Sequence, residues 1–304
     1  MYELGGFDLL NAGFIPIVNG DSNVALSGFL DMPARLGKTH YDWAGEVGIE
    51  PYVSASEIFF GGRALTLTGV VTGADQYECN DKVSAIYRAI DGFTDLVPLV
   101  TEYGTYNVFV NAAIAGEYMP DAGQTKGIKL TIPMREPVVS MPGVVPIGTN
   151  SEFGIDGISF LELGGEYIQL EGDRRNRTAP KGENASVYGK ESYLITNPVA
   201  PELKLKIAIK QPTYAGMKEK ADAVMALFAK PGMRSLTVNN DRLRSFFVKD
   251  GFKASRVYIK DEFSFCLLEC SLTESGIGGT FADLVDALGN RITNNEGDII
   301  RVRI

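Results

Sequence analysis

The sequence has very few of the residues on which enzyme chemistry most often depends. Its 304 residues include one histidine, one tryptophan and three cysteines. The histidine, His40, is the one residue whose ordinary side-chain pKa lies near neutrality, and no nucleophile motif such as Gly-x-Ser-x-Gly accompanies it. One histidine and three scattered cysteines cannot supply the four tetrahedral ligands of a zinc site. We therefore expect no catalytic residue, no metal ion and no cofactor, and we predict that the protein is not an enzyme.

Long hydrophobic runs are absent as well. No apolar stretch reaches the roughly 18 residues that a membrane-spanning helix needs. The opening stretch MYELGGFDLLNAGF has an acidic residue and no basic region before its apolar part, unlike a secretory signal peptide. We expect a protein that neither spans a membrane nor carries a cleaved signal.

The cysteines are too few and too scattered for a disulfide framework. Cys79, Cys266 and Cys270 are odd in number and lie in distant segments. Cys266 and Cys270 fall in a stretch that alternates like a strand, which places their Cα atoms roughly 13 Å apart; a disulfide bridges about 7 Å at most. The sequence predicts three reduced, structural thiols in a reducing compartment, with Cys79 just before a helix and the other two on one face of a strand.

What the chain does contain is a recurring order of strand and helix. Residues 63–73 alternate as a half-buried strand does, and residues 80–92 carry apolar side chains at helical spacing. Asn80 is the expected cap at the start of this helix and Gly92 ends it. Residues 202–210 and 217–232 repeat the same order of strand and helix.

The two stretches keep one register. Lys82 and Lys220, and the flanking apolar positions, are separated by a constant 138 residues. Residues 106–110 match residues 244–248 at that spacing. Chance rarely keeps one register over several elements, so the chain is predicted to contain two copies of one unit.

The fold class predicted for each unit is mainly β with α: a β-sandwich or open barrel flanked by one helix. Each unit closes with an alternating strand, at residues 127–134 and 262–272. We expect the first unit to span residues 1–148 and the second residues 149–276. Residues 277–304 are expected to form an extension with a short helical turn and a hairpin around the NNEG turn.

A short arm precedes the first long strand of each unit. The stretch GKTHYDW in the first arm and GKESYLI in the second share the pattern Gly-Lys-x-x-Tyr, with Ser192 at the position of His40. A catalytic histidine has no reason to recur in a structural arm, so we interpret these residues as scaffold. The interface candidates in the arms are His40, Tyr41, Trp43 and Tyr193, with Trp43 as an aromatic anchor.

Charge is divided unequally between the units. Residues 201–260 carry 13 basic and 5 acidic side chains, whereas residues 63–120 carry 3 basic and 7 acidic ones. Such a basic run can mark a nucleic-acid footprint, but Lys204 and Lys206 alternate with leucine and isoleucine and mark the outer face of a strand. We favour a subunit-facing surface, and add Lys204, Lys206, Arg242 and Arg244 to the interface candidates.

The order of elements resembles the tail-tube module of long-tailed bacteriophages, and most closely the distal tail protein family. The stretch DMPARLGKTHYDWAGEVGIEPYVSAS looks like the belt hairpin of that family, and RALTLTGVVTG with its following helix looks like the segment that builds the ring wall. The resemblance implies a structural virion protein, assembled in the host cytoplasm, that forms a ring at the tail tip. Genomic DNA would pass through its lumen without specific binding, with the tube protein above and hub or fibre proteins below.

The sequence departs from the distal tail pattern in carrying a second tube-like unit where that family has a carbohydrate-binding-like domain. Tandem tube-like modules occur in baseplate hub proteins, where three chains supply six modules. Heterologous contacts close into rings when the rotation fits, and acidic units placed against basic ones favour alternation. We therefore expect a homotrimer with pseudo-sixfold symmetry. A true hexamer is the alternative assembly, and a surface or carbohydrate-binding β-sandwich protein is the alternative function.

Overall fold

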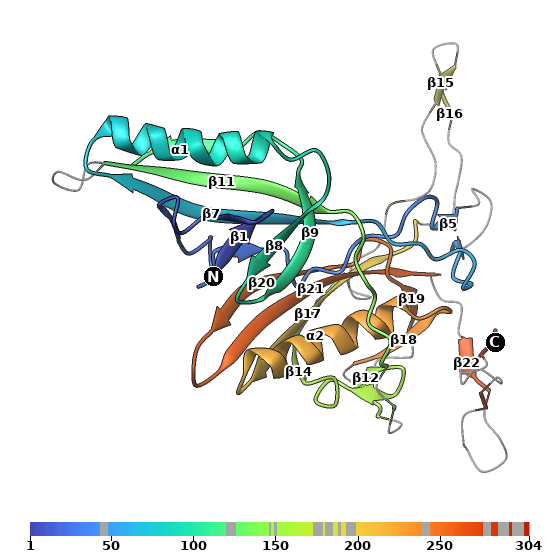
Figure 1. The fold of residues 1–304 in the computed structure, drawn as a ribbon. Coiled ribbons are helices and arrows are strands. Elements are labelled where there is room, and N and C mark those ends of the chain that lie inside the picture. Colours follow the sequence, from blue (N-terminus) through green and yellow to red (C-terminus); the bar gives the residue numbers. More distant parts are fainter. Residues whose placement is uncertain are drawn as a thin grey trace.

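The computed structural model describes thirteen stretches of the chain: residues 1–42, 48–119, 126–145, 147–148, 151–172, 179, 185–187, 190–192, 199–238, 244–275, 281–284, 292–293 and 301–303. Within them the fold is mainly β with two helices. Two large antiparallel sheets, one curled into a half-barrel, each pack against one helix (Figure 1). The predicted fold class and the two similar units are thus confirmed. No described helix is long and apolar enough to cross a membrane.

The first sheet is built by the N-terminal half of the chain. Helix α1 (Gln76–Asp91) packs on its two longest strands. The strand order is β2 (Phe7–Asp8), β1 (Tyr2–Leu4), β8 (Val97–Thr101), β9 (Gly104–Val110), β11 (Lys126–Glu136), β7 (Arg63–Gly73) and β3 (Phe14–Pro16), with β10 (Ala115–Tyr118) also on β11 and β4 (Leu26–Ser27) also on β7.

The second sheet repeats this topology. Helix α2 (Tyr214–Ala229) packs on β17 and β21 as α1 packs on β7 and β11. The strand order is β13 (Ile158–Ser159), β12 (Gly154–Ile155), β18 (Arg234–Thr237), β19 (Arg244–Phe247), β21 (Ser264–Glu274), β17 (Glu202–Gln211) and β14 (Gly165–Glu171), with β20 (Phe252–Ile259) also on β21. Strand for strand, the path is that of the first sheet.

Among the described residues, three two-stranded sheets lie outside the large ones. They are β5 (His40–Tyr41) with β6 (Glu50–Pro51), β15 (Ala185–Val187) with β16 (Lys190–Ser192), and β22 (Phe281–Asp283) with β23 (Arg301–Arg303). The prediction of a helical turn is wrong at residues 281–283, because they pair in register with residues 301–303. The NNEG turn lies outside the described residues.

Both helices begin earlier in the chain than predicted, because the residues that cap them lie upstream of the apolar pattern. Asp75, and not Asn80, caps α1, since its carboxylate accepts from the backbone N–H of Glu78 at 2.8 Å. The carboxylate of Glu78 accepts from the N–H of Ala74, the residue before the cap, at 2.7 Å. Cys79 therefore lies in the first turn of α1, not before it. Gly92 ends α1 as predicted.

The second helix begins and ends under different constraints. Thr213 caps α2 by accepting from the N–H of Gly216 at 3.2 Å. The helix ends at Ala229, short of the predicted Gly232, because Lys230 is extended and precedes Pro231. A residue before proline is driven out of the helical region by the proline ring.

The duplication also includes a hairpin turn that the sequence pattern did not predict. Gly5 and Gly6 connect β1 to β2 with φ values of 59° and 85°, and Asp156 and Gly157 connect β12 to β13 with 52° and 77°. Two-residue turns with both φ values positive match the twist of paired strands, and favour glycine or Asp-Gly. The two turns lie 151 residues apart in the chain.

A second turn repeats at the same spacing of 151 residues. Gly13 and Gly164 have φ values of 84° and 76°. A Cβ atom at Gly13 would lie 3.0 Å from Cδ of Lys82, and one at Gly164 would lie 2.3 Å from Cγ of Lys220. The lysines matched in the repeat thus pack their stems on matched glycines.

One connected apolar core fills the interior of both units. Along β21, Cys266, Leu268 and Cys270 alternate inward with outward side chains, as predicted. All three thiols are free and buried, and burial raises the pKa of Cys266 to about 12. Cys266 and Cys270 share one inward face of the strand, as predicted.

Candidate interface surfaces

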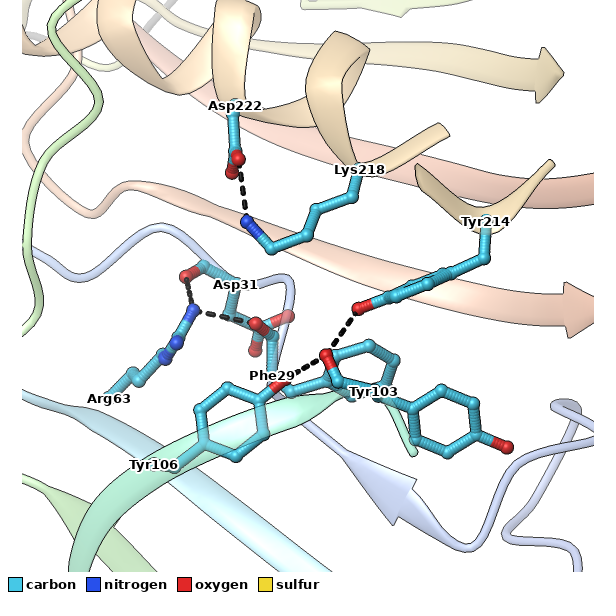
Figure 2. A network of polar contacts seen from close by, with 8 residues as sticks. All are labelled: Phe29, Asp31, Arg63, Tyr103, Tyr106, Tyr214, Lys218 and Asp222. Atoms are coloured by element: carbon cyan, nitrogen blue, oxygen red, sulfur yellow. Dashed lines mark hydrogen bonds and ion pairs between the residues drawn. The ribbon is translucent and has the colours of Figure 1, made fainter. Parts of the chain in front are cut away.

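The two units meet at a cluster of aromatic side chains. The carbonyl oxygen of Tyr103 accepts hydrogen bonds from the hydroxyls of Tyr106 at 3.1 Å and of Tyr214, the first residue of α2, at 2.8 Å. The ring of Phe29 stacks on that of Tyr103 with centroids 5.3 Å apart (Figure 2). This junction therefore ties the loop between β8 and β9 to the second helix.

The segment that carries Phe29 is fixed from both sides. The guanidinium of Arg63 donates to the carbonyl of Phe29 at 2.6 Å and pairs with Glu136 at 2.6 Å (Figure 2 shows the first of these contacts). On the other side, the carboxylate of Asp31 accepts from the N–H of Ala254 at 2.8 Å. The segment thus joins β7 and β11 of the first sheet to β20 of the second.

Burial of the junction has a consequence at high pH. Loss of solvent raises the pKa of Tyr106 to about 12 and also raises that of Tyr214. A phenol whose pKa is raised by folding contributes stability that is present below its ordinary pKa, near 10, and is lost as the pH rises. We expect these tyrosines to ionise together with cooperative unfolding, measured by tyrosinate absorbance and circular dichroism in one alkaline titration.

A matched variant tests this assignment. Tyr214→Phe keeps the ring but removes the bond to Tyr103, so the unfolding free energy should fall by about 1 kcal/mol at neutral pH. In this variant the alkaline transition should lose one ionising group. Gradual ionisation of the full set with the fold intact would show that the junction is open to solvent.

The described parts of the first arm (residues 31–60), namely residues 31–42 and 48–60, lie along the second unit of the same chain. Its backbone is bonded to three separate loops and strands there: Arg35 N–H to the carbonyl of Lys249 at 2.7 Å, Ile49 N–H to that of Ser275 at 2.8 Å, and Gly232 N–H to that of Val53 at 2.7 Å. Met32 also forms a bridge with Phe252 of β20. An arm that begins in one unit is therefore received by the other.

Phe247 of β19 lies beneath this arm. The guanidinium of Arg35 lies 5.6 Å from its ring centroid, and the imidazole of His40 lies 5.9 Å from it. Phe247 is 1% exposed. Burial lowers the pKa of Arg35 to about 10, with a further contribution from the charge of Arg234.

His40 belongs to this contact and is partly buried. Its Nδ1 lies 3.0 Å from the hydroxyl of Thr39. Burial lowers its pKa, and the charge of Lys249 lowers it further. Tyr41 beside it lies under the ammonium group of Lys38, 3.8 Å from the ring centroid. Trp43, Tyr193 and Arg242 lie outside the described residues.

Replacing His40 with glutamine should change little. We expect the free energy of unfolding at pH 8 to stay within about 0.5 kcal/mol of wild type, as for most partly exposed positions. Because folding lowers the pKa of His40, its contribution is present above pH ~6.5 and is lost as the pH falls. The free energy of unfolding should therefore fall less between pH 8 and pH 5 in His40→Gln than in the wild type, as measured by urea unfolding. A large loss at pH 8 would assign His40 a greater role.

The Gly-Lys-x-x-Tyr stretches differ in strand pairing. In the first arm, His40 and Tyr41 form the first strand of a hairpin and pair with Glu50 and Pro51 downstream. In the second arm, residues 190–192 form the second strand and pair with residues 185–187 upstream. The shared pattern thus marks arms with hairpins, but not one hairpin register.

The basic candidates of the second unit have different surroundings. Lys204 is exposed on β17 and Lys206 pairs with Glu171 at 3.9 Å, so both point outward as expected. Arg244 does not: it is 4% exposed and pairs with Glu274 across β19 and β21 at 3.3 Å. Its assignment to an outer surface is corrected, because the neighbouring closing strand supplies its counter-charge inside the chain.

A second buried ion pair was not predicted from the sequence. The carboxylate of Asp156 binds the guanidinium of Arg234 at 2.7 Å, and the N–H and hydroxyl of Ser235 at 2.6 and 3.0 Å. The side chains of the pair are 14% and 5% exposed. Asp156 stands where the first unit has Gly5, so this pair is a feature of the second unit.

The described residues contain no group of three or more histidine, cysteine or acidic side chains placed to hold a metal ion. Their surface features are an occupied arm contact, a unit junction and open grooves. No protein-family model, curated protein or solved structure matches this chain.

Proposed function

We propose that this chain is a structural virion protein that forms a ring at the distal end of a bacteriophage tail. The ring surrounds the DNA channel and joins the tail tube to baseplate hub or fibre proteins. Three chains supply six modules with pseudo-sixfold symmetry. The proposal rests on the two-module architecture and on the resemblance to tail-tube modules.

The observation that carries the proposal is the first arm, bound along the second unit. A contact between one module and the next of the same kind is heterologous, and its repetition generates a closed ring when the rotation fits. Within the described residues, one chain makes this contact once, through the first arm. Three chains arranged head to tail would repeat it around a ring.

The charge division between the units supports the same arrangement. Acidic surfaces of one unit facing basic surfaces of the next favour alternation, and penalise contacts between like units. Contacts of this kind weaken at raised ionic strength, whereas backbone pairing and apolar contact do not.

Native mass spectrometry over a salt series tests the proposal. We expect an assembly of three chains at micromolar concentration, with a larger share of single chains as ionic strength rises. A chain that stays monomeric at every concentration and salt condition would contradict a ring protein and favour the surface-binding alternative.

A further inference from the structure

The two units differ in what covers one matched phenylalanine. Phe109 in β9 lies opposite Arg135, and Phe247 in β19 lies opposite Thr273, which is the same register at the spacing of 138 residues. Phe247 is 1% exposed beneath the first arm, whereas Phe109 is 39% exposed. The first unit therefore presents to solvent the site that the second unit covers with an arm.

An open groove surrounds Phe109. It has a volume of about 610 Å³ and is formed by the end of α1, the loop that follows it and the end of β9. Leu96 on its rim is 44% exposed. In the second unit the matching end of α2, at Ala229 and Pro231, faces residues of the first arm, among them Ile58. The groove thus lies at the end of α1 that matches the end of α2 beside the first arm.

We infer that this groove receives the second arm, residues 173–199, of a second copy of the chain. The first arm already makes the equivalent contact inside one chain, from one unit to the next. In the described part of the second arm, hairpin β15–β16 pairs with neither large sheet. Its receiver is then the first unit of a neighbour, through the groove around Phe109.

Charge supports this pairing. The first arm carries five acidic and two basic residues, and Lys230 and Lys249 of the second unit lie beside it. The second arm carries five basic and three acidic residues. The groove is lined by Asp91 and Asp95 and by no basic residue. The charges of the second arm and the groove are thus the reverse of those of the first arm and the second unit. The basic second arm is attracted to the acidic groove, whereas the acidic first arm would be repelled from it.

Each arm is preceded by a glycine that packs against the start of the unit's long strand, so the two arms leave their units at matching positions. A Cβ atom at Gly28 would lie 2.0 Å from the carbonyl oxygen of Ala64, and one at Gly172 would lie 2.3 Å from that of Glu202. Ala64 and Glu202 occupy matching positions in β7 and β17. Hairpin β15–β16 of the second arm stands clear of both large sheets in Figure 1. It is therefore placed to contact another molecule.

This inference rests on the proposed function, since both require that chains associate. Cross-linking of mixed chains tests it. Isotope-labelled and unlabelled chains are mixed, allowed to assemble and treated with a carbodiimide, which joins carboxylates to amines in direct contact. We expect cross-links from Asp91 or Asp95 to Lys181 or Lys190 that join one labelled and one unlabelled peptide. Arm-to-groove links within single chains only would overturn the inference.

A variant of the groove separates this inference from the proposed function. Phe109→Glu should weaken association roughly 30-fold or more, as loss of an aromatic anchor does. Tyr77→Glu is the control, since Tyr77 is 83% exposed on α1 and does not line the groove. Circular dichroism should show both variants folded.

The outcomes distinguish the two claims. Unchanged assembly of Phe109→Glu without arm-to-groove cross-links would overturn the inference and leave the ring standing. A wild-type chain that never associates would overturn both. Mixed cross-links together with selective loss of assembly in Phe109→Glu support both.

Discussion

Replacing Phe29 with alanine is expected to lower the free energy of unfolding by about 3–5 kcal/mol, the loss typical of a large aromatic removed from a core. Phe29 is 2% exposed. Its ring contacts Tyr103, Tyr106 and Tyr214, with centroid distances of 5.3, 6.4 and 6.4 Å. Since these residues come from both units, the cavity would open at their junction.

The same variant should change how the chain unfolds. One connected core predicts a single cooperative transition for the wild type, and a damaged junction predicts two separated transitions in calorimetry. Phe59→Ala is the matched control, since Phe59 is 61% exposed and its loss should cost less than about 0.5 kcal/mol. Equal stability of Phe29→Ala and Phe59→Ala would remove Phe29 from the account of the junction.

Replacing Asp156 with alanine is expected to cost a similar amount, about 3–5 kcal/mol, because it leaves the buried guanidinium of Arg234 without its carboxylate. The backbone adds to this loss. Asp156 has a φ of 52°, a conformation that aspartate tolerates better than alanine does. Urea unfolding at pH 7 measures the change.

An exposed ion pair gives the control. Lys218 and Asp222 lie 2.6 Å apart on α2, with side chains 43% and 31% exposed. Lys218→Ala should cost only about 0.3–0.5 kcal/mol, as surface pairs one helical turn apart do. If Asp156→Ala were as mild as Lys218→Ala, the buried pair would not stabilise the second unit.

The long strands and both helices could be predicted from the sequence because local patterns determine them. Alternation fixed β7 at residues 63–73 and β17 at residues 202–211 to within one residue. The start of α1 was misplaced because the apolar pattern begins after the first turn, whereas the capping carboxylate of Asp75 lies before it. The repeated turns at Gly13 and Gly164 left a readable signal, a glycine spacing of 151 residues.

The interface residues were harder to predict, because their surroundings depend on contacts distant in sequence. Arg244 reads as an outward residue of a basic strand, yet Glu274 lies beside it and the chain buries both. His40 was correctly placed in an arm, but the pattern around it does not show that Phe247 of the same chain receives that arm. Phe109 lies on the outward face of the alternating strand β9, whereas the arm contacts of its counterpart Phe247 depend on residues distant in sequence.

Cryo-electron microscopy of the assembled protein, viewed down its symmetry axis, would show whether a ring exists. We expect six similar modules from three chains around an open channel, with density bridging each second unit to the first unit of the next chain. A monomer at micromolar concentration, or a particle without a central channel, would contradict this expectation.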